Sequence, residues 1–107
     1  ASIGATAGMT WMIGGDDTQI VGACSNIYAN LTGLVCDGAK ESCSMKLSTT
    51  AEESIISTYL AGNGVISEKN DGILGNNIEE TISNVGKLSQ DAFTKVDDLI
   101  LEIIVNR

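Results

Sequence analysis

The 107-residue chain has no histidine, no proline and only 6 lysine or arginine residues. The lack of histidine removes the commonest general base and the commonest zinc ligand. Against 14 acidic residues the formal net charge is −8, and no basic run could neutralise phosphates, so we expect no binding to nucleic acid or to an anionic membrane surface. No apolar run approaches the roughly 20 residues needed to cross a bilayer, so no membrane span is predicted.

Cysteine is also scarce, with only Cys24, Cys36 and Cys43. An odd number of cysteines, with no secretory leader, argues against a disulfide scaffold and for a reducing compartment, so we expect a cytoplasmic protein. The sequence starts at Ala1 without an initiator methionine. That start fits trimming, a tag remnant or a piece of something longer.

Apolar residues recur at helical spacing and no alternating pattern persists, so residues 1–107 are predicted to form one all-α domain of four to six helices. Residues 1–13 are expected to form a buried helix with Trp11 in the core. Asp16 or Asp17 then caps the next helix. The inward stripe of that helix contains Ile20, Cys24, Ile27, Tyr28 and Leu31, with Cys24 as a buried small hydrophobe.

A further helix is expected to begin near Lys40 and to reach Leu60, either unbroken or restarted by a capping box at residues 49–53. Residues 65–77 are polar and contain glycine, which predicts a loop. Asn77 and Glu80 have the spacing of a helix start. The clearest amphipathic pattern follows over residues 78–103, with a break expected near Gly86 or residues 89–91.

Cys36 and Cys43 flank a polar, glycine-containing turn. Two thiols seven residues apart, joined by a segment too polar for a core, suit a shared ligand. The pair alone is a weak metal signal, and inert thiols are the alternative reading. A zinc site would need two further ligands at paired spacing, which the sequence does not offer, and no phosphate-binding glycine loop is present.

The segment from Asn30 to Lys46, NLTGLVCDGAKESCSMK, resembles the C-terminal part of the L-cysteine desulfidase family. That family is related to the α-domain of bacterial iron-sulfur L-serine dehydratases, which carry a similar NLxGLVCD string and a second cysteine at somewhat longer spacing. The flanking segments 7–15 and 71–89 match the order of elements in the desulfidase branch. The resemblance covers nearly the whole chain, and its cysteine motif is more specific than its flanks.

This resemblance implies a [4Fe-4S] cluster held by three cysteines, with one iron open to the leaving group of the substrate. Cys36 and Cys43 match two of these cysteines, and the third is expected upstream of Ala1. Elimination of H2S from L-cysteine, or of water from L-serine, gives an enamine that hydrolyses to pyruvate and ammonia. L-cysteine is the first choice, and the sequence leaves L-serine open.

The chain would then be the C-terminal segment of a longer enzyme, inactive alone, with the N-terminal remainder of that enzyme as its partner. The catalytic base is not assigned, and a homodimer stays open. Asn30, Asp37 and Lys40 are candidates for contacts around the substrate or cluster, although a turn-stabilising Asp37 and a solvated Lys40 fit equally well. The alternative function is a noncatalytic helical module that binds a partner helix.

Overall fold

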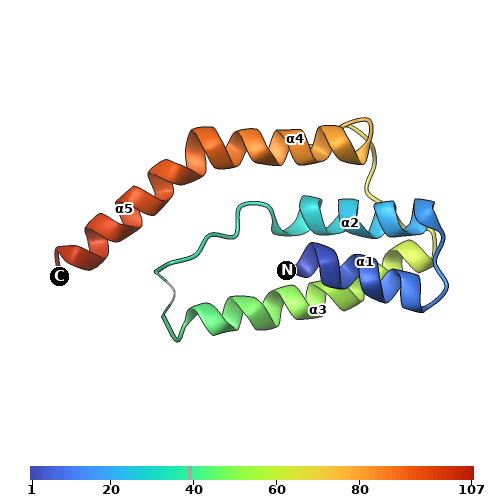
Figure 1. Cartoon of the computed structure of the whole chain (residues 1–107), viewed down its shortest axis with the longest axis horizontal. Helices are drawn as coiled ribbons and strands as arrows, with labels where there is room; N and C mark the ends of the chain where they lie inside the picture. Colours follow the sequence, from blue (N-terminus) through green and yellow to red (C-terminus); the bar gives the residue numbers. More distant parts are fainter. Residues whose placement is uncertain (39) are drawn as a thin grey trace.

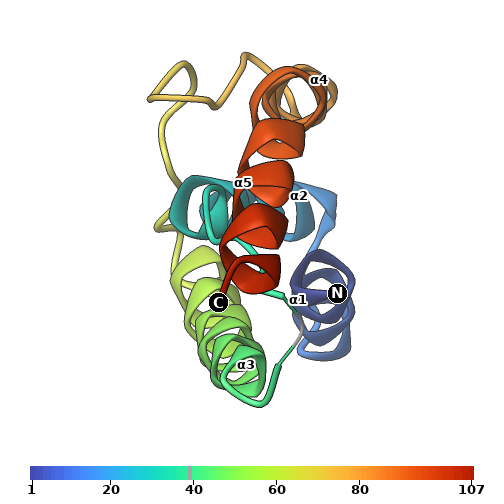
Figure 2. The same ribbon diagram turned by 90° about the vertical axis from the view of Figure 1, so that its left-hand side faces the viewer.

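The computed structural model describes residues 1–38 and 40–107, and within them it contains helices and no strand. The helices are α1 (Ser2–Met12), α2 (Asp17–Leu31), α3 (Cys43–Gly62), α4 (Ile78–Leu88), the π-helix η1 (Ser89–Phe93) and α5 (Thr94–Val105). The helices α1, α2 and α3 pack against one another, and α4 lies along α2 (Figure 1). Figure 2 shows this arrangement end on. The all-α prediction is confirmed, and none of the described helices has the length and apolar character to cross a membrane.

Two helix starts follow the capping rules read from the sequence. The Gln19 amide donates to the Asp16 carboxylate at 2.8 Å, and the Gln19 side chain accepts from the Asp16 amide at 2.9 Å. The Asn77 side chain likewise accepts from the Glu80 amide at 2.9 Å. Each contact gives a partner to a first-turn N–H group that has none within its own helix, which fixes where α2 and α4 begin.

Small hydroxyl residues fill the contact between α1 and α3. The Thr10 hydroxyl donates to the Thr6 carbonyl at 2.8 Å and lies 3.4 Å from the Thr58 hydroxyl, which donates to the Ser54 carbonyl at 2.8 Å. All four residues are buried. Their short side chains let the two helices approach closely, while the hydroxyls find partners in their own helix backbones.

The expected burial of residues 1–13 is wrong in one respect. Helix α1 forms over Ser2–Met12, but its buried residues are Thr6 and Thr10, whereas Trp11 is 71% exposed and Met12 is 78% exposed. The more polar side of α1 therefore faces α2 and α3, and its apolar side faces outward. The stripe of α2 does point inward as predicted, with Cys24 and Ile27 buried.

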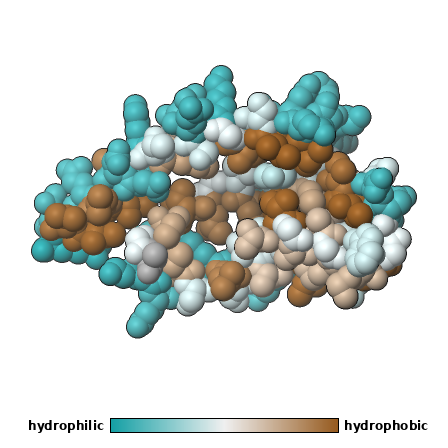
Figure 3. Space-filling view, viewed as in Figure 1, coloured by the Kyte–Doolittle hydropathy of each residue, from teal (hydrophilic) through white to brown (hydrophobic). Residues whose placement is uncertain are grey.

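Helix α3 runs unbroken from Cys43 to Gly62, so the alternative with two helices is wrong. Thr49 and Thr50 do not cap a new helix, because their hydroxyls donate to carbonyls of the preceding turn, those of Met45 and Leu47. The predicted break at residues 89–91 appears as η1, a change of winding between α4 and α5. Helix α5 packs against none of α1 to α4, and its apolar side chains form the brown surface at the left of Figure 3.

The predicted loop over residues 65–77 is present, and Asn26 of α2 anchors it. The Asn26 amide donates to the Val65 carbonyl at 3.0 Å, and its oxygen accepts from the Ser67 amide at 2.8 Å and the Ser67 hydroxyl at 2.9 Å. Asn26 is only 8% exposed, so water cannot readily replace these bonds.

We expect Asn26→Ala to lower the free energy of unfolding by about 3 kcal/mol, because several hydrogen bonds are lost and loop groups are left without partners. Urea unfolding followed by circular dichroism measures the change. The matched control is Asn63→Ala, since the exposed side chain of Asn63 donates to the Tyr59 carbonyl of the helix that it follows and its loss should change stability by about 0.5 kcal/mol or less. Equal effects of the two substitutions would contradict the anchoring role.

Candidate functional site

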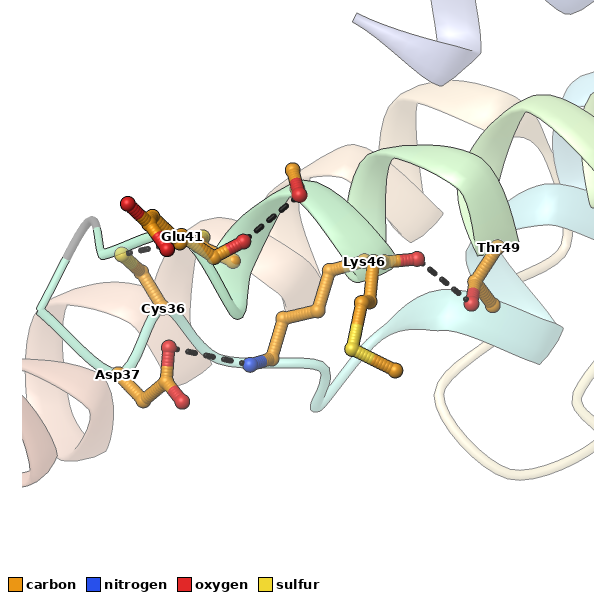
Figure 4. Close-up of polar contacts among 8 residues, drawn as sticks. Cys36, Asp37, Glu41, Lys46 and Thr49 are labelled. Atoms are coloured by element: carbon orange, nitrogen blue, oxygen red, sulfur yellow. Dashed lines mark hydrogen bonds and ion pairs between the residues drawn. The ribbon is translucent and has the colours of Figure 1, made fainter.

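Cys36 and Cys43 come together at the edge of the molecule. Cys36 is exposed in the loop between α2 and α3, which we call the cysteine loop (residues 32–42), and Cys43 is the half-buried first residue of α3. Their sulfur atoms lie 3.7 Å apart, a contact drawn as a dashed line in Figure 4. This separation is far longer than the roughly 2.05 Å of a disulfide bond. The two thiols therefore form no disulfide and lie in hydrogen-bonding contact.

Backbone hydrogen bonds shape the end of the cysteine loop. The Cys43 amide donates to the Lys40 carbonyl at 2.8 Å, and the Ser44 amide and hydroxyl both donate to the Glu41 carbonyl, at 3.1 and 2.7 Å. These bonds form the tight turn that leads into α3. The predicted polar turn also includes Ala39, which lies outside the described residues.

Gly38 lies where the cysteine loop meets the end of α5. Its φ of +110° is in the left-handed region that favours glycine. A Cβ atom added at Gly38 would lie 2.6 Å from Cδ1 of Ile104, which is too close. Glycine at this position thus allows both the backbone turn and the close approach of α5.

An ion pair joins the cysteine loop to α3. Lys46 Nζ lies 3.2 Å from an Asp37 carboxylate oxygen, and Figure 4 shows the two side chains pointing toward one another. The hydrogen bond from Lys46 lowers the pKa of the Asp37 carboxyl. Asp37 follows Cys36 directly, and Lys46 lies in the first turn of α3, as Cys43 does. The ion pair between Asp37 and Lys46 therefore links the two segments that carry the cysteines.

Two opposing electrostatic effects act on the thiols. The hydrogen bond with the Cys36 thiol, followed by desolvation and by the repulsion of a thiolate at Cys36, raises the pKa of the Cys43 thiol. The amino-terminal end of α3 carries the positive end of the helix dipole, which favours a thiolate at Cys43. A bound cation would relieve the repulsion between the two thiolates.

The other candidate residues lie around the pair in different ways. Lys40 is exposed and contributes its backbone carbonyl to the turn. Asn30 donates to the Glu53 carboxylate of α3 at 2.5 Å, so its side chain links α2 to α3. Of the three candidates Asn30, Asp37 and Lys40, only Asp37 has a side chain that ties the cysteine loop to α3 through an ion pair.

Cys24 lies apart from the other two cysteines. It is 7% exposed, and its sulfur lies 3.9 Å from the Ile3 carbonyl oxygen at the contact between α2 and α1. Burial raises the pKa of the Cys24 thiol. Its place in the helix contact agrees with the sequence-based expectation of a buried small hydrophobe and not a ligand.

The chemistry of the pair fits part of a thiolate metal centre. Two thiolates on one tetrahedral ion, each about 2.3 Å from the metal, are about 3.8 Å apart, close to the 3.7 Å observed between the sulfurs. Cysteines on different irons of one cluster lie farther apart than this, so cluster binding requires the two side chains to separate. Among the described residues no group of three or more cysteine, aspartate or glutamate side chains is placed to hold a metal, so the pair supplies an incomplete ligand set.

A cavity of about 460 Å³ begins beside the cysteine loop. Its wall includes Thr32 and Gly33 at the start of the cysteine loop, Asp71 in the loop before α4, and Phe93 in η1. Sequence patterns did not indicate this cavity, because residues 65–77 were recognised only as a loop. The packing of α4 along α2 brings Asp71 and Phe93 near Gly33.

A family model and several similar proteins match nearly the whole chain. The model of the family described as serine dehydratase alpha chain matches residues 1–102. A UPF0597 protein of Clostridium botulinum (strain Okra / Type B1) is 58% identical over 103 residues, which are 96% of this chain and 24% of that protein. UPF0597 proteins of Desulforapulum autotrophicum and Photobacterium profundum are 44% and 40% identical over the whole chain, which spans 24% and 25% of their lengths. No solved structure has significant similarity to the chain.

The burial of the cysteines predicts two classes of thiol reactivity. After full reduction, we expect Cys36 and Cys43 to react with a thiol reagent at pH 8 at least about tenfold faster than Cys24, whose burial limits both access and the thiolate fraction. Timed alkylation with peptide mass spectrometry measures each site, and a Cys24→Ala variant should lack the slow site alone. Modification of Cys24 as rapid as that of the exposed pair would contradict the packing described here.

Proposed function

Because the chain belongs to the serine dehydratase alpha chain family, to which residues 1–102 match, we propose that it is part of an iron-sulfur-dependent amino-acid lyase. The single observation that carries this proposal is that Cys36 and Cys43 converge at one edge of the molecule, with their sulfurs 3.7 Å apart, so that both lie within reach of one iron-sulfur centre once their side chains separate onto different irons. Thiolates are the usual ligands of iron-sulfur clusters, and these two converge at an exposed edge where further ligands can join them. Family membership alone would not distinguish a ligand pair from two inert core thiols.

In this proposal Cys36 and Cys43 bind a [4Fe-4S] cluster. When bound, such a cluster with one iron open to substrate supplies a Lewis acid for the leaving group on the substrate β-carbon. The ion pair between Asp37 and Lys46 holds the cysteine loop against α3 and thereby keeps the thiols in reach of a common centre. The dipole of α3 offsets part of the negative charge that the thiolates bring.

The chain spans 24% of the length of the first curated relatives, and we propose that it is the C-terminal domain of a longer enzyme. The third cluster ligand, the residues that recognise the substrate and the base that removes the α-proton would then come from the remaining polypeptide. The isolated segment should accordingly be inactive. A reducing cytoplasm fits thiols that must stay available for iron.

For the substrate we propose L-cysteine first and L-serine second. Both carry a leaving group on the β-carbon, and elimination from either gives pyruvate and ammonia. The thiolate of L-cysteine is the softer donor and suits an open iron better than a hydroxyl group does. Among the residues of this chain, Asn30, Asp37 and Lys40 remain candidates for contacts near the substrate or cluster.

Anaerobic reconstitution of the full-length protein with iron and sulfide should give a brown protein with broad visible absorption. We expect Cys36→Ser and Cys43→Ser each to remove most of this absorption and the bound iron, because each removes a thiolate ligand. Metal and sulfide analysis per chain, with absorption spectra, measures the loss.

The matched control for the reconstitution is Cys24→Ala, which removes a buried thiol and should leave iron content unchanged. A full-length wild-type protein that stays colourless and iron-free would overturn the cluster proposal. It would favour the alternative, a noncatalytic helical module that binds a partner helix.

The choice of substrate is tested on the reconstituted full-length enzyme. We expect release of pyruvate from L-cysteine with an equal amount of sulfide, and a kcat/KM for L-cysteine at least about tenfold above that for L-serine, which corresponds to about 1.4 kcal/mol of transition-state stabilisation. Coupled pyruvate and sulfide assays measure both reactions. A preference for L-serine would leave the lyase assignment in place and reverse the order of substrates.

A further inference from the structure

The outward side of α1 has the composition of a protein interior. We call it the outer face of α1, and it consists of Gly4, Ala5, Gly8, Trp11 and Met12, all of which are exposed. Helix α1 contains no charged side chain. A helix on the surface of a globular protein normally turns charged and polar residues to water.

In α1 the polar residues face the interior and the apolar residues face outward, the opposite of a normal surface helix. Thr6 and Thr10 face α3 and are fully buried, and their hydroxyls donate to carbonyls one turn earlier. Trp11 and Met12 are 71% and 78% exposed. A helix of a globular protein turns its apolar side toward other protein and not toward water, so the apolar, uncharged outer face of α1 has the character of a surface that another segment covers.

Gly4 and Gly8 give this face a shape suited to another helix. They lie one turn apart, and a Cβ atom added to either would meet nothing within 4 Å. Glycine in an exposed helix is less favourable than alanine, and no contact among the described residues explains its use at these two positions. Small residues four apart form a shallow notch in which the backbone of a second helix can approach closely.

Met12 of the outer face of α1 also lines an apolar groove between α1 and α3. The groove has a volume of about 260 Å³, and its wall includes Met12 of α1, Ile13 directly after it, and Ile55 and Tyr59 of α3. Tyr59 is 67% exposed. In Figure 3 the surface over α1 is white to pale brown, in contrast to the teal side chains along α4.

We propose that the outer face of α1 is covered by an uncharged helix from the remaining part of the same longer polypeptide. The relatives continue well beyond the segment that this chain matches, since the chain spans only 24% of their length. A segment linked in the same chain is present at high effective concentration and can cover the face without a separate binding partner. The inference rests on the proposal that the chain is part of a longer protein, and it does not depend on the iron-sulfur cluster.

The test uses the full-length protein without iron. In a Trp11→Cys variant, maleimide labelling of the new thiol should be at least about tenfold slower in the folded protein than in urea, because the covering helix excludes the reagent. The control is Glu79→Cys on the charged first turn of α4, which should label at nearly the unfolded rate. Peptide mass spectrometry separates these sites from the native cysteines.

The labelling results distinguish a covering helix of the same polypeptide from a second copy of the chain and from an uncovered face. Labelling of Trp11→Cys as fast as Glu79→Cys in a folded monomer would overturn the proposal. Protection that is present in a dimer and lost on dilution to the monomer would also overturn it and assign a second copy of the chain. Neither result would affect iron binding by Cys36 and Cys43, so failure of the docking proposal is distinguishable from failure of the proposed function.

A second pair of variants gives an answer even where Trp11→Cys fails to fold. Leucine has a higher helix propensity than glycine, so Gly8→Leu raises the Tm of the full-length protein if the outer face of α1 meets water. If a helix is seated on the notch, Gly8→Leu lowers the Tm by several degrees, because the larger side chain forces the two backbones apart. A raised Tm would therefore reject the proposal.

Discussion

The position of the cysteine pair depends on the close contact between α1 and α3. Small hydroxyl side chains form this contact. Thr10 and Thr58 lie at this contact with their hydroxyl groups 3.4 Å apart. Larger side chains would hold the two helices farther apart and change the position of α3 against α2. The cysteine loop joins the end of α2 to the start of α3, so the place of those two ends determines whether Cys36 can reach Cys43. The packing of hydroxyl groups deep in the helix cluster thereby sets the geometry of two sulfur atoms at its edge.

The sequence predicted the parts of the fold that local chemistry controls. Asp16 and Asn77 cap helices as their spacing indicated, and the inward stripe of α2 is buried where periodicity placed it. The continuity of α3 could not be predicted, because the hydroxyls of Thr49 and Thr50 can either cap a new helix or bond their own helix, and the fold selects the second arrangement. Trp11 was placed in the core because an apolar pattern shows which residues avoid water. It does not show which part of a protein covers them.

The pairing of the two cysteines was predicted from the sequence, and the rest of the geometry around them was not. Two cysteines around a polar turn indicated a shared ligand, and their sulfurs do lie in contact. The ion pair between Asp37 and Lys46 was not predicted, because it joins a loop to the side of a helix whose start was expected three residues earlier. The cavity beside Gly33 depends on contacts between segments far apart in the sequence, which a pattern of local spacing does not encode.

The π-helix η1 has a consequence for the cysteine loop, although it lies far from it in the sequence. A π turn holds about one residue more than an α turn, so it rotates every later side chain by roughly 100° about the helix axis relative to a regular helix. That rotation sets which side chain of α5 meets Gly38, and in this structure it is Ile104. Loss of a single residue from η1 would point a different side chain at the loop. A change in the number of residues in η1 would therefore change which side chain contacts the cysteine loop near Cys36 and Cys43, as a substitution in α5 would.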